Sequence, residues 1–277
     1  ALLANISALY AMWHGPDGLR AIALRIKHQA ASFAQSAKNA GFEISDDERF
    51  DTVTIRKVEA ERLRRQVLGE GINICVRDDE TISISFDEKS TGEHLDALGR
   101  GFGFEVQRYE GKVSEEFKRT SRYLTDPIFS AKQSETAMMR YLRSLADKDL
   151  ALDRTMIPLG SCTMKLNAAT EMESITWPEF ASLHPFAPED QSRGTRQIIS
   201  ELTSWLIEVT GYDAISLQPN AGSQGEFAGL LAIRAYHRAR NEGHRDICLI
   251  PSSAHGTNVA SAIMAGMKVV VVSCDDS

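Results

Sequence analysis

The chain has 277 residues, of which 43% are hydrophobic and 25% are charged, the balance of a soluble globular protein rather than a disordered or fibrous one. Its formal net charge of -7, with no long basic run, argues against a nucleic-acid-binding protein. The most apolar stretch, residues 267–272, is far shorter than the ~20 residues needed to cross a bilayer, so we expect no membrane span.

Four cysteines are spread along the chain without a CxxC pair. This spacing fits neither a zinc site nor the disulfide framework of a small secreted domain, so we expect a reducing compartment and no metal. The chain opens without a methionine inside a helical pattern, Leu2 to Met12, and stops at Ser277 directly after a strand-like run. Both ends are expected to be cut, which would make the chain a fragment.

Residues 1–100 have the pattern of a small α+β domain. From Leu19 to Ala37, apolar residues recur at a spacing of three to four, which predicts an amphipathic helix that stops at Gly41. Alternating apolar runs and glycine stops predict the elements that follow. These are a strand at 50–58, a helix at 59–68, strands at 72–76 and 81–86, and a helix at 91–98.

Residues 101–155 are interpreted as a linker followed by a helix. Charge, glycine and few periodic apolar positions mark the stretch from Gly101 to Pro127 as a connecting segment. Ser134 has the side chain of an N-cap, and the helix that it begins has apolar positions from Met138 to Leu145.

Residues 156–277 alternate helical and strand-like patterns, which is typical of parallel β-α units in an α/β domain. Helices are expected at 195–209, 225–240 and 258–265. Strands are expected at 215–217, 247–250 and 269–273.

Two loops of this second half follow expected strands. Residues 218–226, QPNAGSQGE, join a strand to a long helix, and their small side chains and free helix-start N–H groups could hold a phosphate dianion. They match neither a P-loop nor a dinucleotide fingerprint, so an ordinary strand-to-helix turn is the alternative. The next loop carries His255, which could meet the same ligand in the crevice at the carboxyl ends of the strands, or could be a structural histidine.

A third stretch, IPLGSCTMKLNA at 157–168, crowds hydroxyl, thiol, amine and amide groups into a segment without clear periodicity. It is followed by WPEF at 177–180 and HPF at 184–186. We interpret it as a loop that presents polar groups, with a well-packed structural loop as the alternative. A nucleophilic Cys162 is the weaker hypothesis, because no neighbouring residue indicates a depressed thiol pKa.

Two further strings follow, TGYDAISLQPNAGSQGE and GHRDICLIPSSAHGTN. Taken together and in this order, the strings resemble the P-protein family of the glycine cleavage system. The resemblance covers residues 156–272 almost continuously and extends to residues before Gly101. It implies the end of the first and the start of the second of two related halves. It also implies an aminotransferase-like, fold-type-I α/β domain that binds pyridoxal phosphate.

The resemblance implies roles for individual residues. The phosphate of the cofactor would lie against Ala221, Gly222, Ser223 and Gln224. His255 would stack on the pyridine ring, with Thr257 and Asn258 on the same wall. The glycine carboxylate would lie near Ser161, Thr163 and Lys165.

The implied activity is glycine decarboxylation, with transfer of the aminomethyl group to the lipoyl arm of the H-protein. The resemblance also implies a homodimeric enzyme, located in a bacterial cytoplasm or a mitochondrial matrix. No His-Lys pair follows Met156, so the Schiff-base lysine is expected to be missing and the chain alone inactive. Another fold-type-I decarboxylase or transaminase, or a non-catalytic structural or dimerisation fragment, is the alternative. The stretch 161–167 would not be expected in other fold-type-I enzymes.

Overall fold

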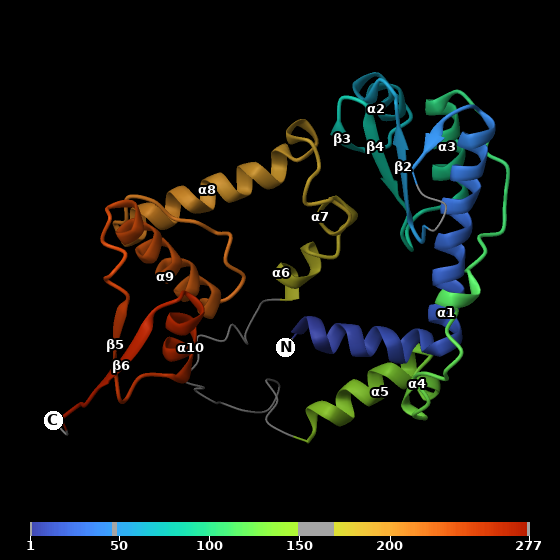
Figure 1. Ribbon diagram of the computed structural model, residues 1–277. Helices are drawn as coiled ribbons and strands as arrows, with labels where there is room; N and C mark the ends of the chain where they lie inside the picture. The colour runs from blue at the N-terminus through green and yellow to red at the C-terminus, as the bar shows by residue number, and fades with distance from the viewer. Residues whose placement is uncertain (1, 46–48, 149–168, 276–277) are drawn as a thin grey trace. The chain divides into compact units, whose positions relative to one another are not determined.

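A computed structural model describes residues 2–45, 49–148 and 169–275 (Figure 1). Its helices and strands form two compact units, residues 1–155 and 156–277, and both element types occur in each. The mixed α/β class expected from the sequence is confirmed at this level. Within the described ranges, no helix is both long and apolar enough to cross a membrane.

The N-terminal unit begins with α1 (Leu2–Asn39), a long helix that is broken at Gly15. Gly15 has φ 63° and ψ 179°, and Pro16 follows it. Glycine reaches a positive φ without steric cost, and a residue before proline is disfavoured from the helical region. The two helical patterns expected near the N-terminus are therefore the two arms of one kinked element.

A four-stranded antiparallel sheet follows, with its strands in the order β1-β2-β4-β3. The strands are β1 (Glu43–Ile44), β2 (Thr52–Arg56), β3 (Cys75–Asp78) and β4 (Thr81–Ser85). The strand expected at 72–76 was placed too early, because Ile72 and Ile74 pack against the hydrophobic core before the ladder with β4 begins at Cys75.

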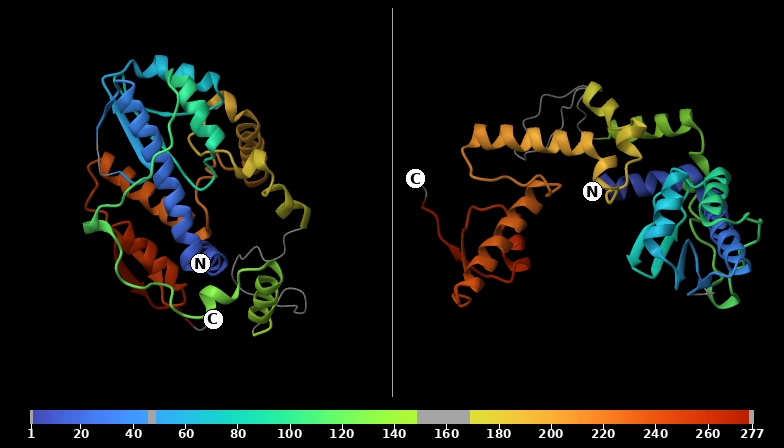
Figure 2. Two further views of the ribbon diagram at one scale, coloured as in Figure 1. Left: turned by 90° about the vertical axis from the view of Figure 1, so that its right-hand side faces the viewer. Right: turned by 90° about the horizontal axis from the view of Figure 1, so that it is seen from above.

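One face of this sheet is covered by α1, α2 (Ala60–Gly69) and α3 (Gly92–Phe102), as Figures 1 and 2 show. Alternate residues of the two central strands, β2 and β4, point into the core between the sheet and the helices. They are Val53, Ile55, Ile82 and Ile84. Phe33 of α1 is fully buried at the centre of this core, and its ring meets that of Phe102 edge-on at 5.2 Å. The expected α+β unit is thus built around a single aromatic-rich core.

The opposite face of the sheet carries hydroxyl groups that pair across the strands. Thr52 Oγ1 lies 2.9 Å from Ser85 Oγ, and Thr54 Oγ1 lies 3.1 Å from Ser83 Oγ. Arg77 of β3 donates to the same Ser83 oxygen at 3.2 Å. Each of these hydroxyls therefore has a hydrogen-bond partner within the sheet itself.

Residues 104–112, which form a strap, follow α3 and lie along α1. Gln107 N–H donates to the Ser36 hydroxyl at 3.0 Å, and further along the chain Tyr123 donates its hydroxyl hydrogen to the Pro16 carbonyl at 2.6 Å. The elements beyond the strap are the 3₁₀ turn η1 (Glu115–Phe117), α4 (Ile128–Ala131) and α5 (Glu135–Ala146). Ser134 accepts a hydrogen bond from Ala137 N–H at 3.3 Å, so the expected N-cap of α5 is confirmed.

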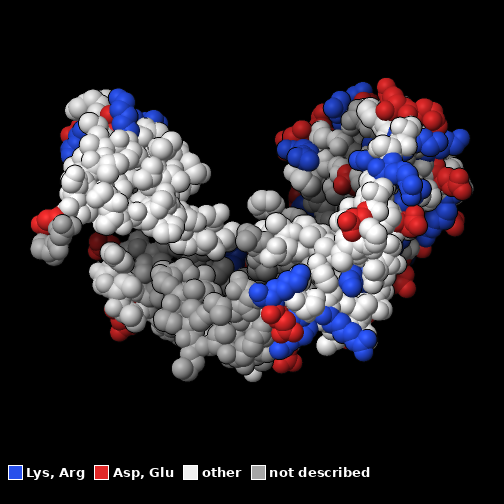
Figure 3. All heavy atoms as spheres, turned by 90° about the horizontal axis from the view of Figure 1, so that it is seen from below, with Lys and Arg blue, Asp and Glu red and all other residues white. Residues whose placement is uncertain are grey.

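The C-terminal unit begins with short elements and one long helix, α8 (Arg193–Thr210). The short elements are α6 (Ala169–Ser174), α7 (Pro178–Ala181) and the 3₁₀ turn η2 (Glu189–Gln191). Large apolar side chains of α8 are exposed along its length, namely Ile198, Ile199, Leu202, Trp205 and Val209. The face of this unit that Figure 3 displays carries few charged side chains.

The rest of this unit is α9 (Gly222–Ala239) and a β-α-β motif formed by β5 (Ile247–Pro251), α10 (Gly256–Met264) and β6 (Lys268–Val272). The two strands pair in parallel, as expected, and α10 packs on both strands and on α9. Ile250 of β5 and Ala262 of α10 are buried in this packing. The motif lies beside α9 in the views of Figures 1 and 2.

The strand expected at 215–217 was wrong. These residues have no strand partner among the described residues, and the chain is irregular there. The Ser216 hydroxyl instead accepts a hydrogen bond from Gln218 N–H at 3.3 Å. The run is only three residues long, and an apolar pattern this short does not by itself distinguish a strand from an irregular segment.

Candidate functional site

The start of α9 presents backbone donors that, in the part of the chain that the structure describes, donate no hydrogen bond to an N-cap side chain. The N-cap residue is Ala221, in extended conformation with φ -155° and ψ 160°, and it has no side-chain acceptor to offer. A Cβ placed on Gly222 would meet nothing within 4 Å, so the backbone there is open to a ligand. The N–H groups of the first turn and the exposed Ser223 hydroxyl can therefore bind an anion.

The side chain of Gln224 holds the loop that leads into this helix. Its Oε1 accepts a hydrogen bond of 2.7 Å from the N–H of Asn220, which lies just before the N-cap. The side chain thereby fixes the approach of the loop to the helix. Its backbone N–H and its side-chain amide nitrogen remain the groups through which Gln224 could contact an anion, because only a donor can bind one.

The start of α10 is capped by His255. Its Nδ1 accepts a hydrogen bond from Thr257 N–H at 3.1 Å and lies 2.9 Å from the Thr257 hydroxyl. A ring nitrogen that accepts from a backbone N–H carries no proton, so the proton of the neutral imidazole is on Nε2. The ring is exposed and held in place by the first turn of its own helix.

A side-chain hydrogen bond brings the two helix starts together. Asn258 of α10 donates through Nδ2 to Oε1 of Glu226 on α9, at 2.7 Å. Glu226 lies about one turn after Gly222, and Asn258 lies in the first turn after His255. The uncapped amides and the imidazole, which the sequence placed on separate loops, thus belong to neighbouring helix starts.

A thiol at the end of β6 lies beside the loop that leads from β5 to His255. Cys274 Sγ is 3.3 Å from Ser253 Oγ, and Cys274 N–H donates to Ser252 Oγ at 3.3 Å. Hydrogen bonds from Ser253 and then Ser252 hold the pKa of the exposed thiol at about 7, below its ordinary value of 9.0. The sequence analysis missed this thiol, because the pairing that brings it to Ser252 and Ser253 spans more than 20 residues.

The other end of β5 is held by charged groups. The buried Arg234 of α9 donates to the carbonyl groups of Gly243 at 2.8 Å and of Arg245 at 3.4 Å. Lys268 of β6 forms an ion pair of 3.0 Å with Asp246, and its hydrogen bond holds the pKa of that carboxyl below the usual range. These contacts fix the turn from α9 into the strand pair, at the end opposite to His255.

The residues expected at the glycine carboxylate, Ser161, Thr163 and Lys165, lie outside the described residues. Of the two strings that follow them, HPF forms a local turn in which His184 Nδ1 accepts from Phe186 N–H at 3.0 Å. Within the ranges that the structure describes, no three His, Cys, Asp or Glu side chains are grouped so as to hold a metal ion.

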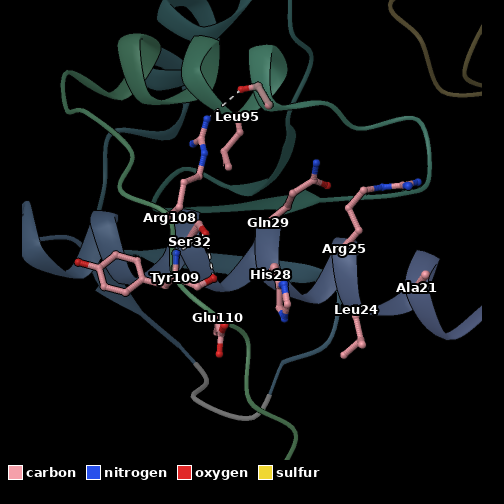
Figure 4. Close-up of a pocket in the computed structure, with 11 residues that line it drawn as sticks. Ala21, Leu24, Arg25, His28, Gln29, Ser32, Leu95, Arg108, Tyr109 and Glu110 are labelled. Atoms are coloured by element: carbon pink, nitrogen blue, oxygen red, sulfur yellow. Dashed lines mark hydrogen bonds between the residues drawn. The ribbon is translucent and has the colours of Figure 1, made fainter.

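A cavity of about 540 Å³ lies in the N-terminal unit between α1, the start of α3 and the strap (Figure 4). Arg108 and Gln29 point toward the start of α3 and Arg25 toward the loop that precedes it, whereas Leu24 and His28 point to the other side of α1. Gln29 donates to the Ser90 carbonyl at 2.8 Å, and its buried Oε1 has no partner among the described residues. The cavity shares no residue with the two helix starts of the C-terminal unit.

In this site, a helix start suited to an anion lies beside a histidine in an α/β unit. Comparison with known proteins shows which proteins the chain is similar to. Residues 1–102 match the family described as glycine cleavage system P-protein. A protein of Mesorhizobium japonicum named glycine dehydrogenase (decarboxylating) is 57% identical over 99% of this chain and 29% of its own length. Proteins of the same name from Brucella melitensis and Bradyrhizobium sp. are 54% and 52% identical, over 99% and 100% of this chain and 30% of their own lengths.

The family model matches the first 102 residues and the relatives match almost the whole chain, so the chain is similar to the glycine cleavage system P-protein along its length, as the sequence resemblance implied. It spans about 30% of the length of the curated relatives named above.

Proposed function

We propose that this chain carries part of the pyridoxal-phosphate site of a fold-type-I enzyme that decarboxylates glycine. The relatives that match it along almost its whole length are named glycine dehydrogenase (decarboxylating). The observation that carries the proposal is the hydrogen bond of 2.7 Å between Asn258 and Glu226. It joins a helix start that can hold a phosphate to a helix start that presents an imidazole.

The donor set fits the phosphate of the cofactor. The amides that follow Ala221, at Gly222, Ser223 and Gln224, are uncapped by any side chain, and the helix dipole of an 18-residue helix favours a dianion there. The Ser223 hydroxyl would add one more donor. In this proposal the four residues 221–224 hold the phosphate.

The imidazole of His255 would lie against the pyridine ring, with its orientation fixed by Thr257 N–H. Thr257 and Asn258 would form the same wall, and Asn258 is the residue that anchors this wall to α9. When bound, pyridoxal phosphate supplies an electron sink for the electron pair of the bond that breaks as carbon dioxide leaves glycine. The family relation further suggests that Ser161, Thr163 and Lys165 bind the glycine carboxylate, and that the homodimeric enzyme passes its aminomethyl group to the lipoyl arm of the H-protein.

Equilibrium binding tests the proposal. The purified chain is titrated with pyridoxal phosphate by calorimetry and absorbance, with inorganic phosphate as a competitor. We expect Ser223→Ala to weaken binding about tenfold, because hydrogen bonds to charged groups contribute roughly 1.5–3 kcal/mol. We expect His255→Ala to weaken it several-fold, since aromatic stacking contributes about 0.5–1.5 kcal/mol.

His244→Ala is the matched control, because His244 is an exposed histidine of the same unit that lies in the turn before β5. It should leave the affinity unchanged. An affinity that neither Ser223→Ala nor His255→Ala alters would contradict the proposal, as would failure of phosphate to compete.

A further inference from the structure

We infer that Glu226 is a positioning residue, whose carboxylate holds the start of α10 at the start of α9 and thereby sets the spacing between the phosphate donors and the imidazole. The inference rests on the proposed function, and it concerns a residue that contacts neither the phosphate nor the ring. Its basis is the geometry of one hydrogen bond and of the groups on either side of it.

The hydrogen bond lies where it can control this spacing. Glu226 Oε1 accepts from Asn258 Nδ2 at 2.7 Å, and both side chains are partly buried. Glu226 lies about one turn beyond Gly222, and Asn258 is the third residue of α10. The bond therefore joins the beginning of the second turn of α9 to the first turn of α10, near the start of both helices.

This bond, together with the packing of α10 on α9, places His255 relative to α9. The contacts described for its ring are with the backbone N–H and hydroxyl of Thr257, which belong to α10. The ring consequently moves with the first turn of α10. The contact between Glu226 and Asn258 ties that turn to the helix that carries the amides of residues 222–224.

A carboxylate suits this role and is unsuited to binding the ligand. It has no hydrogen to donate to a phosphate and would repel one at close range. As the acceptor in a charge-assisted hydrogen bond it holds an amide more firmly than a neutral group would. A glutamine at this position would keep an acceptor oxygen for Asn258 while removing the charge.

The test compares Glu226→Ala with Glu226→Gln in the 277-residue chain, using the affinities for pyridoxal phosphate and for inorganic phosphate. Pyridoxal phosphate needs both helix starts, whereas inorganic phosphate needs only that of α9. We expect E226A to weaken pyridoxal phosphate about tenfold with inorganic phosphate unchanged, and E226Q to retain most of the affinity for both. The absorbance spectrum of bound pyridoxal phosphate should change in E226A, because the environment of its ring changes.

Glu201→Ala is the matched control, since Glu201 accepts a hydrogen bond of 2.8 Å from the side-chain amide of Gln197 on the exposed α8. It should alter neither affinity. Equal weakening of both ligands in E226A would overturn the inference, because Glu226 would then support α9 alone. Tighter binding of both ligands in E226A and E226Q would also overturn it, since Glu226 would then act only through its charge.

The two ideas fail in different ways. If the unmodified chain binds neither ligand, the proposed function fails and the inference falls with it. If the unmodified chain binds pyridoxal phosphate and E226A binds it equally well, only the role of Glu226 is overturned.

Discussion

The hydroxyl of Ser32 makes two hydrogen bonds to one residue of the strap. Its oxygen accepts from the N–H of Tyr109 at 2.9 Å and its hydrogen is donated to the carbonyl of the same residue at 3.2 Å. Ser32 is only 2% exposed. One small side chain of α1 thus satisfies both backbone groups of Tyr109, as an adjacent strand would.

Ser32→Ala should therefore lower the free energy of unfolding by about 1 kcal/mol, because it leaves two partly buried backbone groups of Tyr109 without this partner. Urea titration followed by far-UV circular dichroism measures this. Ser7→Ala is the control, since Ser7 lies on the same helix, is exposed, and bonds only to the Leu3 carbonyl. Equal effects of the two substitutions would show that the strap does not depend on Ser32.

Gly111→Ala should destabilise the same junction by steric overlap. A Cβ on Gly111 would lie 2.6 Å from Lys27 Cγ and 2.7 Å from the Lys27 carbonyl oxygen, which belongs to the backbone of α1. Overpacking of this kind costs about 1–3 kcal/mol, so the midpoint of urea unfolding should fall.

Gly69→Ala is the matched control for that substitution. Gly69 ends α2, and a Cβ there would meet nothing within 4 Å. We expect this variant to be as stable as the unmodified chain, or more stable by up to about 1 kcal/mol, since alanine favours the helix. A Gly111→Ala variant that matched it would mean that the strap can move away from α1 at little cost.

The thiol of Cys274 should react in the neutral pH range. Because hydroxyl groups stabilise its thiolate and hold its pKa at about 7, the rate of alkylation should rise with pH to a half-maximum near 7. The measurement uses iodoacetamide on a chain in which Cys75, Cys162 and Cys248 are replaced by serine.

Ser253→Ala should move that half-maximum upward, toward the ordinary value of 9.0, because it removes the largest contribution to the shift. Ser204→Ala on the exposed α8 should leave it unchanged, since Ser204 bonds to the Ser200 carbonyl of its own helix. A pH profile that is the same in Ser253→Ala and in the unmodified chain would refute this explanation of the lowered pKa.

Sequence patterns predicted most elements of the N-terminal unit, because amphipathic spacing and glycine stops report local structure and burial directly. The helix from Leu19 onward and the strand that contains Ile82 and Ile84 are examples, and both are buried in the core. The attachment of the strap to α1 was not predictable in this way. It depends on the hydroxyls of Ser32 and Ser36, which carry no signal of a backbone partner more than 70 residues away.

In the C-terminal unit, the same reasoning predicted the helices and the parallel pair but failed at 215–217. Strand formation there depends on a neighbouring strand, which an apolar run alone does not reveal. The bond between Asn258 and Glu226 joins the helices that follow the two loops, whereas their binding of one ligand stays a prediction, and Glu226 itself had been given no role. The sequence alone does not distinguish a glutamate that hydrogen-bonds to a neighbouring helix from a glutamate that is exposed to solvent.

The hydroxyl face of the small sheet bears on how the N-terminal unit can meet its surroundings. Because Thr52 pairs with Ser85 and Thr54 pairs with the buried Ser83, these hydroxyls have hydrogen-bond partners within the sheet and do not need water to satisfy them. A valine or isoleucine at Thr52, Thr54 or Ser85, which are at least partly exposed, would replace these paired hydroxyls with apolar surface and favour association between copies.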